Sequence, residues 1–223
     1  MKLLWAGAIA LGALSCHTFP PGTDGGRPLS REEEPATRER LRQIGAAFRA
    51  EPLFYEIPPG AQVDIDALRL TVLPRADRNT AGSALAEVDT LTFRGPDGTE
   101  ITIPRLKQIT LRLAEERLEG GAAPSWERDA TLAHELGHAF FAARYPLIYV
   151  KSGDFNLIEG HAVTVQWRWT QRHHPEISEE EFLRRRTPSY RNAYLRFQRD
   201  FVRDSHTDWA LLERKEMDLR SGK

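Results

Sequence analysis

Residues His134–His138 read His-Glu-Leu-Gly-His, an H-E-x-x-H motif. Residues four apart on an α-helix lie on one face, about one turn apart. The imidazoles of His134 and His138 are therefore expected to aim one ring nitrogen each at a single ion, and this spacing is typical of zinc. Glu135 points roughly 100° around the helix from His134. We expect its carboxylate beside the open position of the ion, where it accepts a proton from the water that attacks a carbonyl.

The sequence around this motif predicts a buried helix. Ser125 is a candidate N-cap, and Glu127 and Asp129 are acidic residues near the positive end of the expected dipole. Residues 139–143 continue as Ala-Phe-Phe-Ala-Ala, and Pro146 ends the helix. A helix that is apolar on most sides is buried, and a buried histidine pair without a partner is unfavourable. We therefore expect the pair to bind a metal ion rather than to lie on a surface helix.

A catalytic zinc ion normally has three protein ligands and one open position. The metzincin extension of the motif requires Gly at 141 and His at 144, but this chain has Phe141 and Arg144, which excludes that branch. Glu159 is the best third ligand, because it is a lone carboxylate in a mostly apolar segment that should form a second helix after the turn at 152–154. The other downstream candidates are Asp154, His161, His173 and His174.

Three of these histidines have structural interpretations. His161 is two residues from Glu159 and so lies on a different helix face, where we expect a satisfied histidine near the site or at the surface. His173 and His174 end the second helix just before Pro175, where a cationic tip suits the dipole. The sequence therefore predicts one zinc ion per chain, held by two histidines and Glu159.

An H-E-x-x-H motif followed about twenty residues later by a Glu on a second helix resembles the gluzincin branch of zinc metallopeptidases, to which thermolysin belongs. The string from Glu159 to Ala162 resembles the E-G-x-A form of many small bacterial members. The resemblance covers residues 125–172, and it implies that His134, His138 and Glu159 bind zinc. It also implies that Glu135 is the general base.

The chain departs from that family at Val163, where thermolysin-like enzymes carry an Asp that supports a zinc histidine. We expect this support to come from elsewhere in the chain. Residues 188–197 resemble the Y-x-x-G-x-x-F segment that often follows the E-G-x-A helix, with Ala193 in place of Gly.

A tyrosine hydroxyl or a histidine near this segment can donate a hydrogen bond to the tetrahedral oxyanion. Tyr190 is the leading candidate for this catalytic role, followed by Tyr194 and His206. The alternative for each tyrosine is a packing role with a solvated hydroxyl. We expect Tyr190 and Tyr194 to lie on one helix that runs from 179 to 202.

The N-terminal residues predict export. Lys2 and the apolar run that ends at Ser15 have the pattern of a signal peptide over residues 1–15, and the run is too short to span a bilayer. Cys16 is the only cysteine and resembles the acylated residue of a bacterial lipobox, with Ala13 where Leu is commoner. The alternative is an ordinary signal peptide with an incidental cysteine. His17 instead of Asp favours the outer over the inner membrane.

The remaining sequence indicates one tethered domain. Residues 16–37 are rich in Pro, Gly and charge, which predicts a flexible tether, and 38–223 are enough for one domain with its own core. A single cysteine excludes an intrachain disulfide. A net charge of −1 without a basic stripe excludes a nucleic-acid partner. The resemblance implies a peptide or protein substrate, and Cys16 predicts that a lipid anchor binds the membrane.

The fold class expected from the residue patterns is α+β. Arg38–Ala50 fits an amphipathic helix, and Val63–Ile65 and Leu68–Val72 alternate as half-buried strands do. Residues 91–93 and 101–103 flank a Gly-Pro-Asp-Gly turn, which predicts a hairpin. Residues 106–118 fit either a strand or a helix. Strands first and helices second predict α+β, and the resemblance implies a minimal zincin-like domain.

In this family an extended substrate pairs with an edge strand above the active-site helix. Residues 109–113 or 101–103 are the candidates for that strand. The leading functional hypothesis is a zinc endopeptidase of the cell envelope. The alternative is a zinc-binding envelope lipoprotein with a binding or assembly role and no hydrolysis, and a third hypothesis is a structural protein with an accidental motif. Glu135 favours the first, because a structural zinc site needs no base.

Overall fold

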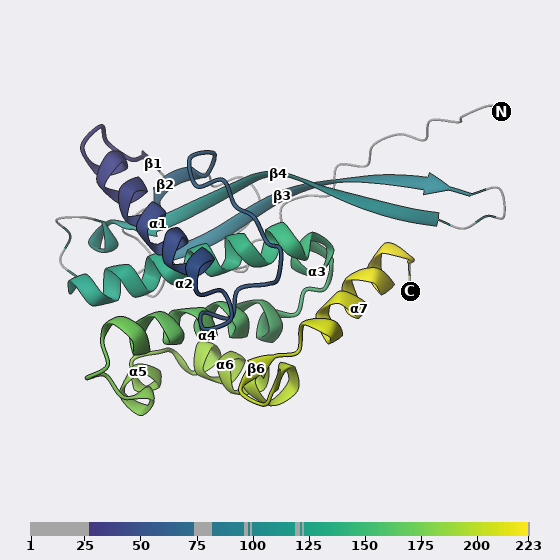
Figure 1. The fold of residues 1–223 in the computed structure, drawn as a ribbon. Helices are drawn as coiled ribbons and strands as arrows, with labels where there is room; N and C mark the ends of the chain where they lie inside the picture. Colours follow the sequence, from purple (N-terminus) through teal and green to yellow (C-terminus); the bar gives the residue numbers. More distant parts are fainter. Residues whose placement is uncertain are drawn as a thin grey trace.

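The computed structural model describes residues 27–73, 82–95, 98, 100–118, 121 and 123–222. A mixed sheet lies against a stack of helices (Figure 1), and the predicted α+β class is confirmed. The predicted signal peptide, Cys16 and the tether as far as residue 26 lie outside the described residues. The folded part begins before the predicted boundary at Arg38, because Arg27–Pro28 already pair with the sheet.

The four-stranded sheet has the order β1-β2-β4-β3. Its strands are β1 (Arg27–Pro28), β2 (Arg69–Leu73), β3 (Gly82–Arg94) and β4 (Glu100–Ala114). β3 and β4 form the predicted antiparallel hairpin, while β2 runs parallel to β4 and β1 antiparallel to β2. Of the ambiguous residues 106–118, residues 106–114 are strand, which pairs with β3 and, from Thr110 onward, also with β2, while 115–117 form a short 3-10 helix. β3 is therefore the edge strand next to the helices.

Two predictions about strands were wrong. The segment 109–113 cannot serve as the edge, because its residues 110–113 pair with β2 on one side and β3 on the other. Val63–Ile65 form no strand. The reason lies in Arg38, whose guanidinium donates to the carbonyl of Ile65 at 2.9 Å and to that of Leu68 at 3.3 Å. These carbonyls are satisfied by a side chain rather than by a ladder.

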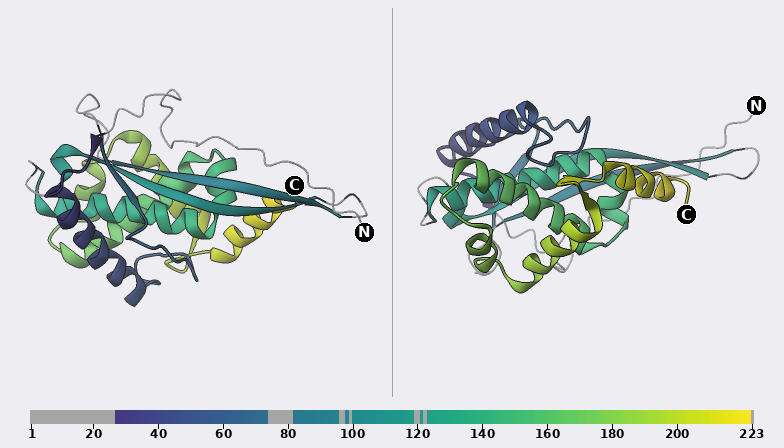
Figure 2. Two further views of the ribbon diagram at one scale, coloured as in Figure 1. Left: turned by 90° about the horizontal axis from the view of Figure 1, so that it is seen from above. Right: turned by 60° about the horizontal axis from the view of Figure 1, so that its bottom comes forward.

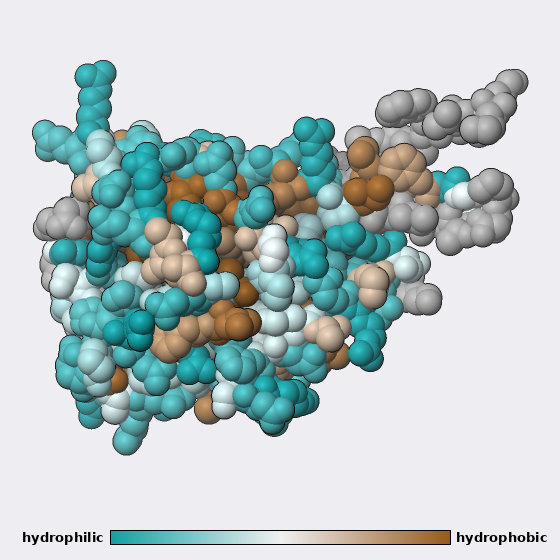
Figure 3. Space-filling model, in the orientation of Figure 1, coloured by the Kyte–Doolittle hydropathy of each residue, from teal (hydrophilic) through white to brown (hydrophobic). Residues whose placement is uncertain are grey.

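The outer part of the β3–β4 hairpin projects from the body as an arm, seen from two further directions in Figure 2. Leu91, Phe93 and Ile103 are exposed on it. Leu91 and Ile103 are directly paired, so they share one face of the ribbon with Phe93. The space-filling view shows hydrophobic surface on the arm (Figure 3).

The helices are stacked in layers on one side of β3. They are α1 (Glu33–Ala50), η1 (Glu115–Arg117), α2 (Ser125–Arg144), α3 (Pro146–Lys151), α4 (Phe155–His173), α5 (Glu179–Arg184), α6 (Pro188–Phe201) and α7 (Trp209–Arg220). A short hairpin, β5 (Val202–Arg203) and β6 (His206–Thr207), separates the last two. α2 packs on β3, α4 packs on α2, and α6 packs on α4. The candidate metal ligands are therefore carried by the two central helices.

Two glycines permit this close helix packing. A Cβ on Gly137 of α2 would lie 3.2 Å from Val165 Cβ of α4. A Cβ on Gly160 of α4 would lie 2.5 Å from the carbonyl oxygen of Ala193 on α6. The Gly of the E-G-x-A string thus has a packing role, because a side chain there would push α6 away from α4.

The helix boundaries differ from prediction at two points. Ser125 is the first helical residue of α2 and Pro124 occupies the N-cap, so the predicted Ser125 cap is wrong. The single helix expected over 179–202 is divided into α5 and α6, with Pro188 starting α6 at the position where its missing N–H costs no hydrogen bond. Within the described part of the chain, no helix combines the length and apolar character needed to cross a bilayer.

Candidate metal centre

The structure brings together the three predicted ligands, His134, His138 and Glu159, here called the ligand triad. The Nε2 atoms of the two histidines are 3.2 Å apart. Oε2 of Glu159 lies 3.3 Å from His134 Nε2 and 3.4 Å from His138 Nε2. A tetrahedral ion about 2.0–2.1 Å from each ligand would hold neighbouring ligand atoms about 3.3–3.4 Å apart. The triad therefore has the dimensions of three corners of a metal tetrahedron.

The triad is buried, with His134 exposed by 7% and His138 and Glu159 by 2% each. Oε2 of Glu159 makes no hydrogen bond within the described residues, although it is close to both rings. A buried carboxylate oxygen without a donor is costly unless a cation binds it. This orphaned oxygen and the two nitrogens beside it fit a metal ion, so the group could hold one.

The electrostatics of the triad follow from its burial. Burial lowers the pKa of His134, against the opposing effect of Glu159, so the ring is neutral at ordinary pH, as a metal ligand must be. Burial by itself raises the pKa of Glu159, but the nearby His138 and His134 rings lower it below its ordinary value. Glu159 is therefore a carboxylate, the form that binds metal.

Within the described residues, the two histidines have no acceptor of the kind expected to support zinc ligands. Among the described residues, neither His134 Nδ1 nor His138 Nδ1 has a hydrogen-bond partner, and both atoms are buried. Val163, which stands where the resemblance implied an Asp, is a fully buried apolar residue. The support expected from another part of the chain is not found in the residues described.

Glu135 lies beside the triad and is only 2% exposed. Its Oε2 atom is buried and has no hydrogen-bond partner among the described residues. Burial, and then the charge of Glu159, raise the pKa of Glu135 well above its ordinary value. A carboxyl in such a setting holds a proton more readily than an exposed glutamate does.

Gly82, the first residue of β3, is a site residue that the sequence did not indicate. A Cβ at this position would lie 2.5 Å from Oε1 of Glu135 and 2.9 Å from its Cδ. Only a glycine lets the strand pass this close to the carboxylate. Nearby, the hydroxyl of Tyr149 on α3 donates to the carbonyl of Ala84 at 2.9 Å, which holds this end of β3 in place.

The three candidates for the oxyanion role have different surroundings. The ring of Tyr190, at the start of α6, lies 6.0 Å from that of His134. Tyr194 is buried and donates its hydroxyl to Oε1 of Glu179 at 2.6 Å, so that hydroxyl is engaged away from the triad. His206 is exposed on β6 and lies 3.3 Å from Glu56. Tyr190 is the candidate that borders the ligand triad.

The other downstream candidates do not join the triad. His161 is fully buried, its Nε2 lies 2.8 Å from the carbonyl oxygen of Glu56, and burial lowers its pKa to about 3. His173 stacks on Trp169 and lies 3.2 Å from the Tyr55 hydroxyl.

The remaining two candidates also have structural positions. His174 lies 3.5 Å from Glu176. Asp154 caps α4 through the backbone N–H of Leu157.

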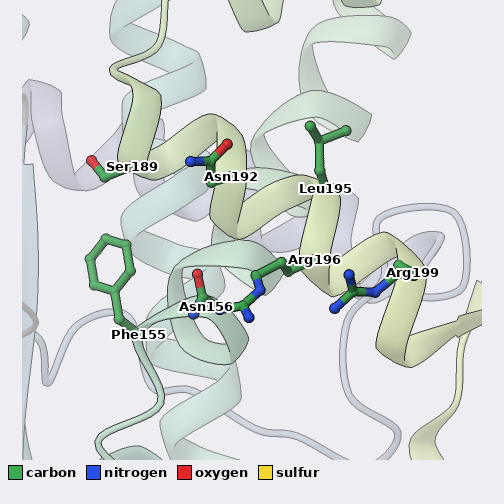
Figure 4. A pocket seen from close by; sticks show the side chains of 7 residues that line it. All are labelled: Phe155, Asn156, Ser189, Asn192, Leu195, Arg196 and Arg199. Atoms are coloured by element: carbon green, nitrogen blue, oxygen red, sulfur yellow. The ribbon is translucent and has the colours of Figure 1, made fainter.

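A cavity of about 580 Å³ lies between the first turn of α4 and α6. Figure 4 shows Phe155 and Asn156 of α4 facing residues of α6 across it. The ring of Phe155, which lines the cavity, lies 5.9 Å from that of Tyr190. The cavity is lined by Phe155, Asn156, Ser189, Asn192, Leu195, Arg196 and Arg199, and so contains none of the triad.

Comparisons with protein-family models, curated proteins and solved structures found no match to this chain.

Proposed function

We propose that this protein is a zinc-dependent endopeptidase. The observation that carries the proposal is the triangle of His134 Nε2, His138 Nε2 and Glu159 Oε2, with sides of 3.2, 3.3 and 3.4 Å. Two imidazoles and one carboxylate are ligands that zinc takes in catalytic sites. Three protein ligands leave a fourth position for water or substrate, whereas structural zinc sites are closed by a fourth ligand.

Glu135 acts as the general base in this proposal. Bound zinc would polarise the scissile carbonyl and lower the pKa of the attacking water. The Glu135 carboxylate takes the proton from that water and returns it to the leaving amine. Its buried setting supports this role, because a raised pKa makes a carboxylate a stronger base. Tyr190 donates a hydrogen bond to the developing oxyanion.

The substrate would lie along β3. This strand is the edge of the sheet beside α2, and its first residue, Gly82, contacts Glu135. An extended peptide can add to such an edge through main-chain hydrogen bonds. We propose that the domain acts at the bacterial cell envelope, anchored by a lipid on Cys16, and more at the outer than at the inner membrane.

The second candidate function is a zinc-binding envelope lipoprotein without hydrolysis. It is favoured by the two buried Nδ1 atoms that lack an acceptor within the described residues, because the histidines of catalytic zinc usually donate to a supporting group. It leaves the buried Glu135 carboxyl beside the triad without a role.

Metal analysis and peptide cleavage by the full-length protein distinguish the two functions. We expect about one zinc per chain and cleavage of a peptide library by the wild type. Glu135→Gln should keep its zinc and lose cleavage by at least about a hundredfold, the usual size of a general-base effect. Glu159→Ala should lose the metal. Glu180→Gln, an exposed glutamate on α5, is the matched control and should change neither.

Zinc bound without cleavage of any peptide would favour the second function. The absence of zinc from the wild-type protein would contradict both the peptidase function and the zinc-binding function.

A further inference from the structure

Three consecutive arginines at the end of α5 have different surroundings. Arg184 is exposed, and no ion pair of it is found among the described residues. Arg185 is engaged twice, donating to Oε1 of Glu127 at 3.1 Å and to Oε1 of Glu181 at 2.8 Å. Arg186 is partly buried, and its Nε atom is buried without an acceptor in the described residues.

Arg186 has a fixed position but no counter-charge within the part of the chain that the structure describes. Its Cζ atom lies 4.3 Å from the centroid of the Phe182 ring, a cation–π contact that holds the guanidinium against α5. No carboxylate of the described residues lies within ion-pair distance of it. Among the described residues, Glu127 is the acidic group whose charge acts on Arg186, and its two oxygens are occupied by Arg117 at 2.6 Å and Arg185 at 3.1 Å.

The burial of Arg186 is therefore not compensated by any carboxylate of the described residues. Burial lowers its pKa to about 10, and the charges of Arg117 and Arg185 contribute in the same direction. A cation that loses water without gaining an anion costs free energy, and such groups concentrate where a ligand supplies the missing charge. The position of the guanidinium indicates which ligand this is.

Arg186 follows Arg185, which donates to Glu127 in the first turn of α2 at 3.1 Å, and it precedes Tyr190, whose ring lies 6.0 Å from that of His134. The positive charge of Arg186 contributes to lowering the pKa of His134, and the negative charge of Glu127 acts to raise the pKa of Arg186. Glu127 and His134 are seven residues apart on one face of α2, which is about 10.5 Å. An extended peptide advances about 3.3 Å per residue. A group one to three residues from a peptide bond at the triad therefore reaches the guanidinium.

We propose that Arg186 binds a carboxylate of the substrate, and that this site selects peptides with an acidic group within about three residues of the scissile bond. The proposal rests on the peptidase function above for the identity of the substrate as a peptide. A guanidinium binds a carboxylate through two parallel hydrogen bonds, which gives direction as well as affinity. The carboxylate is either the C-terminal group of the peptide or the side chain of Asp or Glu.

The test measures binding apart from cleavage. Zinc-loaded, full-length Glu135→Gln protein is dialysed against randomised peptide pools of one length, and the retained peptides are quantified by mass spectrometry. The pools carry a free or an amidated C-terminus, each with or without Asp and Glu. We expect acid-bearing pools to bind at least about tenfold more tightly than neutral pools, the usual effect of a charged hydrogen-bonded pair. Tighter binding of the pool with a free C-terminus would identify the C-terminal carboxylate, and tighter binding of the pool with Asp and Glu would identify a side-chain carboxylate.

Adding Arg186→Gln should abolish this preference, Arg186→Lys should retain part of it, and Arg184→Gln should leave it intact. Equal binding of acidic and neutral pools, or an unchanged preference in Arg186→Gln, overturns the proposal. The melting temperature of Arg186→Gln should not fall below that of Arg184→Gln, because the substitution removes an uncompensated charge. A large fall would show a structural role and also overturn it.

Cleavage by the wild-type protein is measured separately. If acidic peptides bind through Arg186 but no peptide is cleaved, the carboxylate site stands and the peptidase function fails. If peptides are cleaved with no preference for acidic residues, the peptidase function stands and the carboxylate site at Arg186 fails.

Discussion

At the scale of single residues, the site depends on the close approach of Gly82 to Glu135. The carboxylate lies against the first residue of β3, where a Cβ would be 2.5 Å from Oε1. Helix α2 fixes the backbone of Glu135, but the strand limits where its carboxyl group can lie. The direction of the proposed base is therefore set by two elements that are far apart in the chain.

Replacing Gly82 with alanine should displace the Glu135 carboxylate, because the group that the new methyl meets is the far end of a flexible side chain. We expect Gly82→Ala to fold and bind metal like the wild type, and to lose peptide cleavage by about tenfold to a hundredfold, the cost of a misplaced catalytic group. Ser83→Ala, one residue along the same strand, is the control. A fully active Gly82→Ala would show that the contact does not orient the base.

At the scale of secondary-structure elements, α1 illustrates how a local signal defines a boundary. The Ser30 N–H donates to Oε2 of Glu33 at 2.7 Å, and the Glu33 N–H donates to Oγ of Ser30 at 3.1 Å. This reciprocal pair is a capping box. Arg27 donates to both oxygens of the same carboxylate. The box joins the start of α1 to β1, which is why the folded part begins before Arg38.

The capping box predicts a pH dependence of stability. The Arg27 guanidinium and the Ser30 N–H lower the pKa of Glu33 from 4.5 to about 2. A carboxyl with a lowered pKa in the folded state stabilises the fold above the unfolded pKa. This stabilisation is lost as the pH falls from about 4.5 to about 2. Because solvent screens the pair, we expect Glu33→Gln to cost only about 0.5–1 kcal/mol at pH 7.

Urea unfolding of Glu33→Gln and the wild type at pH 7 and pH 2 checks this prediction. The difference between the two proteins in the free energy of unfolding should be smaller at pH 2 than at pH 7. Glu32→Gln, a substitution of an exposed neighbouring glutamate, is the control at both pH values. A difference that is the same at both pH values would contradict the assignment.

At the scale of the whole molecule, the ligand triad joins the two central helices of the stack. Two ligands lie on α2 and one on α4, between the sheet on one side and α6 on the other (Figure 1). The one cysteine of the chain can form no intrachain disulfide. A metal ion would therefore act as the cross-link between layers, and its free energy of binding would add to the stability of the fold.

Chelation should accordingly destabilise the protein. With free zinc at a thousand times the dissociation constant, binding adds about 4 kcal/mol to the free energy of unfolding. For a chain of this size, removing the metal should lower the melting temperature by roughly 8–16 °C. Calorimetry with zinc and with a chelator measures this shift, and Glu159→Ala should show almost none. A wild-type melting temperature indifferent to the chelator would contradict metal binding by the triad.

The grouping of the triad was predictable because its signals are local. His134 and His138 are one helical turn apart, and Glu159 is a charge in an apolar helix, so both facts are visible in short stretches of sequence. The β3–β4 hairpin was predictable for the same reason, since its turn residues lie between two alternating runs. Pro188 is a local signal for the start of α6, although a single helix was predicted over residues 179–202.

What only the tertiary structure decided depends on contacts between distant segments. Alternation marks residues 109–113 as strand-like, but the parallel pairing with β2 makes them interior and leaves β3 at the edge. Gly82 carries no motif, and it reaches Glu135 only because the start of β3 packs against α2. The chemistry of each side chain follows from its residue type. The neighbours that orient a side chain and shift its pKa are determined by how the whole chain packs.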